Sequence, residues 1–191
     1  MDQPQGNAIG NTLEVQEAID ILKNNGPEDI TELCIALAGM MIYLGEKAET
    51  PEEGMQKAQL ALEDGSALEK FRALVEGQGG DSGIIDDYTL MPQAEFCEEL
   101  KAWEEGYIVA IDAMKMGLAS QHTGAGRERK EDEIDMSAGI VLQKKKGDFV
   151  NSGDTICRIY GNDVKKIEKA LEEVKNAVRI GVDKPEKVEI I

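Results

Sequence analysis

The chain has 191 residues, a hydrophobic content of 41% and a formal net charge of -17, from 38 acidic and 21 basic residues. This length is enough for one large domain or two small ones with a real hydrophobic core. The acidic balance argues against binding to a nucleic-acid backbone or an anionic membrane surface, both of which need a basic footprint. The composition therefore favours an acidic cytoplasmic globular protein, without nucleic-acid or membrane partners.

The cysteines and the histidine exclude several kinds of site. Cys34, Cys97 and Cys157 lie far apart, and His122 is the only histidine. The chain therefore lacks the paired spacing of structural zinc sites and of disulfide frameworks. We expect His122 to lie in a loop without an orienting partner, which argues against Ser-His-Asp chemistry.

The first predicted element is a glycine-bracketed loop that leads into a helix. Gly6 and Gly10 bracket a tight loop in which the backbone can approach a ligand closely. Asn11 then begins a helix, with Glu14 at capping-box spacing and Glu17 further along. Carbonyl oxygens of such a loop, with a nearby carboxylate, could hold a hard cation, which prefers oxygen ligands. The alternative is a capped helix with a surface glutamate, which the spacing alone favours.

Apolar side chains recur with helical spacing through the next part of the chain. We expect helices over residues 12–24 and from about 28 to 47, then two more that begin at Thr50–Pro51 and at Ser66. The second helix is apolar on nearly all sides between residues 30 and 44, so it should be packed between two layers. The chain supplies little that could cover both of its faces.

A glycine-rich polar stretch at residues 77–83 is typical of a linker, and it lacks the spacing of a phosphate-binding loop. After it, the pattern predicts a short helix or turn from Met114, a helix over 164–176, and strands at 96–103, 107–111, 140–142, 156–160, 178–180 and 188–191. We therefore expect a helical region over 1–80, a linker over 81–93 and an α+β domain over 94–191.

The first segment resembles the pyrimidine-nucleoside and thymidine phosphorylase family. Its Q-P-x-G-x-A-x-G-N-x-L-E-V-x-E motif is matched by Gln3, Pro4, Gly6, Ala8, Gly10, Asn11, Leu13, Glu14, Val15 and Glu17. The resemblance implies a potassium site, formed by the main-chain oxygens of Gln5 and Ala8 and the side chain of Glu17, and no organic cofactor. The family usually has an apolar residue at position 5, but Gln5 leaves a main-chain ligand chemically intact.

Two motifs in the second half favour different functions. The tetrapeptide Ala113-Met114-Lys115-Met116 is that of the modified lysine in biotin carrier domains, and the turn from Gly147 to Asp154 also occurs in biotin and lipoyl domains. In carriers the lysine turn follows the glycine-aspartate turn, whereas Lys115 precedes Gly147 by about 30 residues. A biotin- or lipoyl-type carrier module with Lys115 modified is therefore the alternative. Otherwise Lys115 is solvated, and the two methionines pack under the following turn.

Residues 124–160 resemble the C-terminal domain of the same phosphorylase family, through the pattern G-A-G-R…K-E-x-x-I-D…G-I-V-L-x-K-K-x-G-D-x-V-x-x-G…I-Y. This implies an α/β plus α+β fold: a mainly helical C-terminal remainder of the phosphorylase α/β domain, followed by a hammerhead-like barrel-sandwich domain. Arg127 is a candidate for a loop near the substrate cleft. An ion pair of Arg127 with Glu131 or Asp132 is the alternative.

The resemblance also implies a function and partners. The family's reaction is phosphorolysis of uridine, thymidine or deoxyuridine to free base and (deoxy)ribose 1-phosphate, in nucleoside salvage and catabolism, by a homodimeric transferase. The family's phosphate loop and base-binding residues precede the matching segment and have no counterpart here. We therefore expect the C-terminal part of the enzyme, with an N-terminal half as its partner, no catalytic residue in this chain and no activity of the chain alone. The sequence does not separate uridine from thymidine preference.

Overall fold

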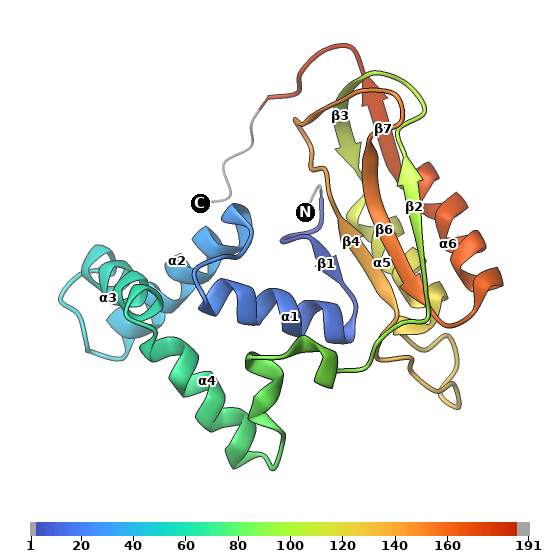
Figure 1. Cartoon of the computed structure of the whole chain (residues 1–191). Helices are drawn as coiled ribbons and strands as arrows, with labels where there is room; N and C mark the ends of the chain where they lie inside the picture. The colour runs from blue at the N-terminus through green and yellow to red at the C-terminus, as the bar shows by residue number, and fades with distance from the viewer. Residues whose placement is uncertain (1–2, 187–191) are drawn as a thin grey trace. The chain divides into compact units, whose positions relative to one another are not determined.

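A computed structural model describes residues 3–186 (Figure 1). Contacts divide these residues into two compact units. Residues 3–15 and 91–186 form what we call the C-terminal unit, and residues 16–90 form the helical unit. The predicted domain boundaries stay a prediction, and the strand predicted at 188–191 lies outside the described residues.

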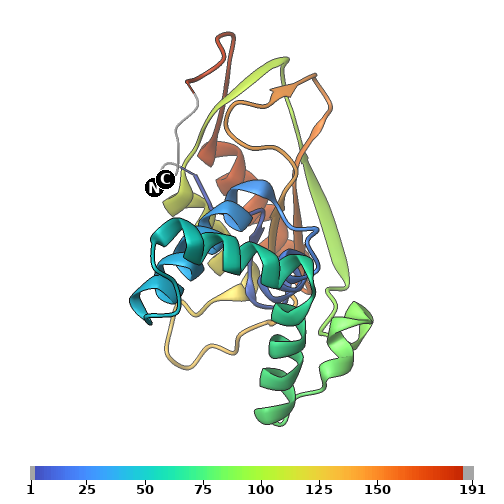
Figure 2. The same cartoon turned by 90° about the vertical axis from the view of Figure 1, so that its left-hand side faces the viewer.

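The helical unit follows the predicted order of helices. Helix α1 (Asn11–Leu22) begins in the C-terminal unit and continues into the helical unit. It is followed by α2 (Glu28–Leu44), α3 (Pro51–Glu63) and α4 (Ser66–Gly77). The 3-10 turns η1 (Ser82–Ile85) and η2 (Tyr88–Leu90) come after α4, in green in Figure 2.

Helices α2 and α3 pack against each other at two glycines. A Cβ atom on Gly54 would lie 2.2 Å from the carbonyl oxygen of Gly39, and one on Gly39 would lie 2.5 Å from the nitrogen of Met55. The two backbones approach this closely because neither position carries a side chain. Thr50 caps α3 as predicted, since its hydroxyl oxygen accepts a hydrogen bond from the nitrogen of Glu53 at 3.2 Å.

Helix α2 leaves large apolar side chains exposed. The exposed fractions of Leu37, Met41 and Leu44 are 58%, 73% and 72%. This agrees with the expectation that an all-round apolar helix finds little cover within this chain. Within residues 3–186, no helix is both long enough and apolar enough to cross a membrane.

The C-terminal unit is built on antiparallel strands. In the described residues, one sheet has the order β1-β4-β6-β2, formed by Ala8–Ile9, Gly139–Leu142, Thr155–Gly161 and Phe96–Lys101. The other has the order β5-β3-β7, formed by Phe149–Val150, Gly106–Ile111 and Val178–Gly181. The remaining elements are α5 (Ala113–Ser120), the π-helical turn η3 (Gln121–Ala125) and α6 (Val164–Ala177). Strands β2 and β3 are neighbours in sequence but belong to different sheets.

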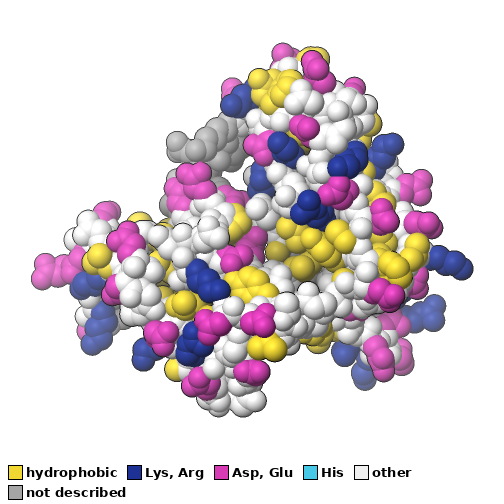
Figure 3. All heavy atoms as spheres, viewed as in Figure 1, with side chains coloured by type: hydrophobic (Ala, Val, Ile, Leu, Met, Phe, Trp, Pro, Cys, Tyr) yellow, Lys and Arg dark blue, Asp and Glu magenta, His cyan; other side chains and the backbone are white. Residues whose placement is uncertain are grey.

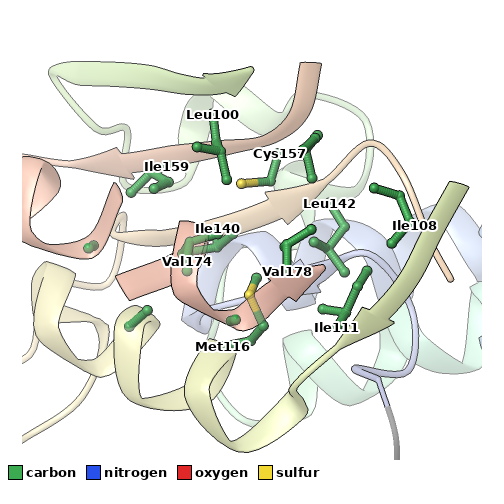
Figure 4. Close-up of a cluster of buried hydrophobic side chains, with 14 of the residues drawn as sticks. Leu100, Ile108, Ile111, Met116, Ile140, Leu142, Cys157, Ile159, Val174 and Val178 are labelled. Atoms are coloured by element: carbon green, nitrogen blue, oxygen red, sulfur yellow. The ribbon is translucent and has the colours of Figure 1, made fainter. Parts of the chain in front are cut away.

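Both sheets and both helices of this unit share one hydrophobic core. Figure 4 shows its side chains pointing toward one another, among them Leu100, Ile108, Ile111, Met116, Ile140, Leu142, Cys157, Ile159, Val174 and Val178. Burial raises the pKa of the Cys157 thiol to about 12, so this cysteine is protonated and packs as a small apolar side chain. The unit is therefore an α+β domain, as the sequence predicts.

Two polar features support this unit from its surface. The carboxylate of Asp163 caps α6 by accepting hydrogen bonds from the nitrogens of Lys165 at 2.9 Å and Lys166 at 3.3 Å. On the β2–β6 pair, the carboxylate of Glu99 lies 2.5 Å from the Lys101 ammonium and 3.0 Å from Nε of Arg158. The hydrogen bonds from these two cations lower the pKa of Glu99 to about 2.

Candidate functional site

The glycine-bracketed first segment forms an edge of the four-stranded sheet. Strand β1 pairs with β4, and the nitrogen of Leu142 donates to the carbonyl oxygen of Asn7 at 2.8 Å. The hydroxyl of Ser120 donates to the carbonyl oxygen of Ile9, also at 2.8 Å. Ala8 is buried between these contacts. The segment with the predicted potassium ligands Gln5 and Ala8 is therefore held on the C-terminal unit.

A lysine from the turn after β4 also holds this segment. The Lys145 ammonium donates to the carbonyl oxygen of Pro4 at 2.7 Å and to the carbonyl oxygen of Gly6. The nitrogen of Lys146 donates to the side-chain oxygen of Gln3 at 3.0 Å. Sequence reasoning missed these contacts, although Lys145 is the second lysine of the K-K motif in the matched family pattern.

The start of α1 differs from the predicted capping box. The helix begins at Asn11 as expected. However, the Glu14 carboxylate accepts its hydrogen bond from the nitrogen of Gly10 at 2.9 Å, one residue earlier than the predicted partner. The Asn11 side chain instead donates to the carbonyl oxygen of Ala125 at 2.8 Å. Gly10 has φ +152°, and a Cβ atom there would lie 2.6 Å from the carbonyl oxygen of Ala138. The close approach predicted for this glycine is therefore to the protein's own backbone.

The three predicted potassium ligands are divided between the two units. Gln5 is half-buried in the bend before β1, and Ala8 lies in β1, so both belong to the C-terminal unit. Glu17 is half-buried on the part of α1 that belongs to the helical unit. Among residues 3–186, no three His, Cys, Asp or Glu side chains are grouped so as to hold a metal ion. Two carbonyl oxygens with one carboxylate are a donor set that suits a hard cation.

Arg127 lies in an exposed loop that is closed by its own hydrogen bonds. Its Nε donates to the main-chain oxygen of Asp132 at 3.1 Å. The carboxylate of Asp132 accepts from the nitrogens of Glu128 at 3.1 Å and Arg129 at 2.7 Å. Arg127 therefore contacts Asp132, one of its two predicted alternatives, but through the carbonyl group of that residue. The approach of Arg127 to a substrate cleft stays a prediction.

The expectation that His122 lacks an orienting partner is wrong. His122 lies in η3, and its Nδ1 is 2.7 Å from the Glu173 carboxylate on α6. Its Nε2 is 3.6 Å from the Glu128 carboxylate. The partner is remote in sequence, so spacing alone could not reveal it. Since Nε2 faces a carboxylate and the Ser120 hydroxyl donates to Ile9, this histidine and serine do not form a nucleophilic pair.

Lys115 does not lie at the tip of a hairpin. It lies in the first turn of α5, and its nitrogen donates to the Asp112 carboxylate at 3.1 Å. Its ammonium is 3.8 Å from the same carboxylate and 3.4 Å from the carbonyl oxygen of Asn176. Met116 is buried but Met114 is 73% exposed, because positions two apart point to different sides of a helix. This placement does not support the carrier alternative, and the packing expected of both methionines holds only for Met116.

Comparison with known proteins gives matches along both parts of the chain. The model of the pyrimidine nucleoside phosphorylase C-terminal domain matches residues 107–181, and the model of the glycosyl transferase family a/b domain matches residues 1–68. The chain is 45% identical to the pyrimidine-nucleoside phosphorylase of Geobacillus stearothermophilus over 180 residues. These residues are 94% of this chain and 41% of the relative. It is 43% identical over 183 residues to that of Bacillus subtilis strain 168, covering 96% of this chain and 42% of the relative.

A third relative, the pyrimidine-nucleoside phosphorylase of Staphylococcus aureus strain COL, is 47% identical over 174 residues, which are 90% of this chain and 40% of the relative. The chain thus spans about two fifths of the length of these relatives. The two family models follow each other along the chain in the order that the sequence motifs indicate. The chain belongs to the pyrimidine-nucleoside phosphorylase family.

Proposed function

We propose that this chain contributes to a cytoplasmic pyrimidine-nucleoside phosphorylase. The reaction transfers the pentosyl group of uridine, thymidine or deoxyuridine to phosphate, which gives the free base and (deoxy)ribose 1-phosphate in nucleoside salvage and catabolism. The observation that carries this proposal is the 45% identity to such an enzyme over 94% of the chain. Catalysis of this kind rests on positioning the reactants and on neutralising phosphate charge. The chain spans about two fifths of the relatives' length, and we assign both tasks to the N-terminal half of a homodimeric enzyme, which is the proposed partner.

The exposed apolar side chains of α2 support such a partner. Leu37, Met41 and Leu44 are each more than half exposed, and apolar surface of this kind marks interaction sites. Acidic side chains are spread over the face shown in Figure 3, which suits a small-molecule enzyme better than a nucleic-acid binder. We therefore propose that the N-terminal half packs on α2, within the α/β domain whose family model matches residues 1–68.

The finer description of the fold is part of this proposal. The C-terminal unit combines a four-stranded and a three-stranded antiparallel sheet in its described residues, with one shared core. We propose that this arrangement is the hammerhead-like barrel-sandwich of the family, and that the helical unit is the remainder of the α/β domain. The match of the C-terminal domain model to residues 107–181 supports the first assignment.

We also propose that the segment before α1 takes part in a potassium site. The main-chain oxygens of Gln5 and Ala8 and the carboxylate of Glu17 would hold the ion. Bound potassium would supply positive charge and stiffen the loop that carries the phosphate contacts. These residues orient the loop and do not themselves react.

A phosphorolysis assay tests the proposal. The purified chain is mixed with uridine or thymidine and phosphate, alone and after refolding with a polypeptide that covers the remaining length of the relatives, and release of free base is measured. We expect release only with the partner. Activity of the chain alone would refute the requirement for the N-terminal half. Inactivity of a stable complex would refute the proposed reaction. A biotinylated band on an avidin blot would instead support the carrier alternative at Lys115.

The potassium site is tested in the same assembly. Activity in potassium chloride is compared with activity in tetramethylammonium chloride at equal ionic strength. Glu17→Gln should abolish the difference between the two salts. The matched control is Glu172→Gln, which removes an exposed carboxylate of α6 and should leave the difference intact. A potassium response that survives Glu17→Gln would contradict the proposed ligand set.

A further inference from the structure

One lysine side chain bridges two peptide groups in the segment before β1. The ammonium of Lys145 donates to the carbonyl oxygens of Pro4, at 2.7 Å, and of Gly6. These carbonyls belong to the two peptide groups on either side of the one that carries the Gln5 carbonyl. A single side chain from the C-terminal unit therefore fixes both neighbours of a proposed cation ligand.

The lysine is itself held in place for this contact. The nitrogen of Lys145 donates to the Asp148 carboxylate at 2.8 Å, which closes the turn after β4. The next residue, Lys146, donates its nitrogen to the Gln3 side chain at 3.0 Å. The half-buried Lys145 thus reaches the segment from an ordered turn, and little freedom has to be lost when its hydrogen bonds form.

The segment needs such a contact, because its own backbone is permissive. Strand β1 begins only at Ala8, so residues 3–7 lie outside the regular ladder. Gly6 has φ +64°, a left-handed conformation that glycine adopts readily but leaves as readily. Hydrogen bonds from an ammonium to carbonyl oxygens are charge-assisted and therefore stronger than neutral ones. They can select one conformation of this segment among several.

We propose that Lys145 is a positioning residue, whose ammonium holds residues 3–7 in the conformation that presents the Gln5 carbonyl beside the carbonyl of Ala8 in β1. The role of Lys145 in cation binding rests on the proposed potassium site. Its hold on residues 3–7, which we call the clamp, does not rest on that site. A preformed pair of carbonyls lowers the ordering cost of binding an ion. Lys145 would in this way act on the proposed site without itself being a ligand.

Amide hydrogen exchange on the full chain tests this proposal. In Lys145→Met the stem is retained and both hydrogen bonds are lost, so amides of residues 5–9 should exchange about tenfold faster. Amides of β6 in the core should be unchanged, which distinguishes local loosening from global destabilisation. Lys144→Met removes the adjacent positive charge and should leave residues 5–9 protected. Lys145→Arg retains donors and should restore most of the protection.

The outcomes separate the clamp from the cation site. Unchanged exchange of residues 5–9 in Lys145→Met, or equal loosening in Lys144→Met, would overturn the clamp. The exchange of the wild-type chain is also measured in potassium chloride and in tetramethylammonium chloride. If potassium gives no added protection there while Lys145→Met still loosens the segment, the clamp is supported and it is the proposed potassium site that loses support.

Discussion

The crossing of α2 and α3 gives a prediction whose size can be worked out from the structure. In Gly54→Ala the new Cβ atom would lie 2.2 Å from the Gly39 carbonyl oxygen, whereas ordinary contact begins at 3.4 Å. The obstacle is main chain and cannot rotate away, so the helices must separate by about 1 Å. Overpacking of this kind costs about 1–3 kcal/mol. Alanine returns about 1 kcal/mol through its higher helix propensity. We expect a net loss of up to about 2 kcal/mol in the free energy of unfolding.

The same substitution at an open helical position is the matched control. A Cβ atom on Gly117 in α5 meets no atom within 4 Å, so Gly117→Ala should stabilise the protein by about 0.5–1 kcal/mol. Urea unfolding followed by far-UV circular dichroism measures both variants against the wild-type chain. If Gly54→Ala proves as stable as Gly117→Ala, the close approach of α2 and α3 does not limit packing, and the reasoning fails.

Further predictions concern the C-terminal unit. Because burial raises the pKa of Cys157 to about 12, iodoacetamide at mildly alkaline pH should label the exposed Cys34 and Cys97 in the native chain and spare Cys157, as peptide mass spectrometry would show; equal labelling of all three would contradict the packed core. The pKa of Glu99 is lowered from 4.5 to about 2, so its contribution to stability is present above pH 4.5 and is lost as the pH falls toward 2. Denaturant unfolding at a series of pH values should therefore show that the loss of unfolding free energy caused by Glu99→Gln becomes smaller as the pH falls from 4.5 toward 2. A loss that does not change with pH would refute the ion pairing. Asp163→Ala removes the cap of α6 and should lower the free energy of unfolding by about 1 kcal/mol, whereas Asp163→Ser should retain most of it; thermal unfolding compares the two.

The periodic part of the fold can be predicted from the sequence. The 3.6-residue spacing of apolar side chains gives α1 to α4 within a few residues, and Thr50 with Pro51 marks the start of α3. Strands β1 and β5 have two residues each, which is too short for any alternation to appear. The assignment of β2 and β3 to different sheets also depends on pairing with strands that are remote in sequence.

The features of the candidate site likewise divide into those with a local sequence pattern and those that depend on remote residues. The motif at residues 3–17 identifies the family and a possible ligand set, because it is a local pattern. The bond from Lys145 to Pro4 joins residues 141 positions apart, and that from His122 to Glu173 joins residues 51 positions apart. Such contacts are set by how the sheets and helices pack, and no local spacing encodes them. Sequence reasoning therefore assigned no contact to Lys145 and no partner to His122.

Residues 3–10 are assigned to one domain by their family match and to another by their contacts. Their family match lies with the a/b domain over residues 1–68, whereas their contacts place them in the C-terminal unit. A domain that only covered a neighbouring site would need no bonds to this segment. Here β4, Ser120 and Lys145 each bind its main chain, at the carbonyl oxygens of Asn7, Ile9, Pro4 and Gly6. Bonds to main-chain oxygens fix the path of the backbone whatever its side chains are. An apolar residue at position 5, as the family usually has, would therefore be held in the same way as Gln5.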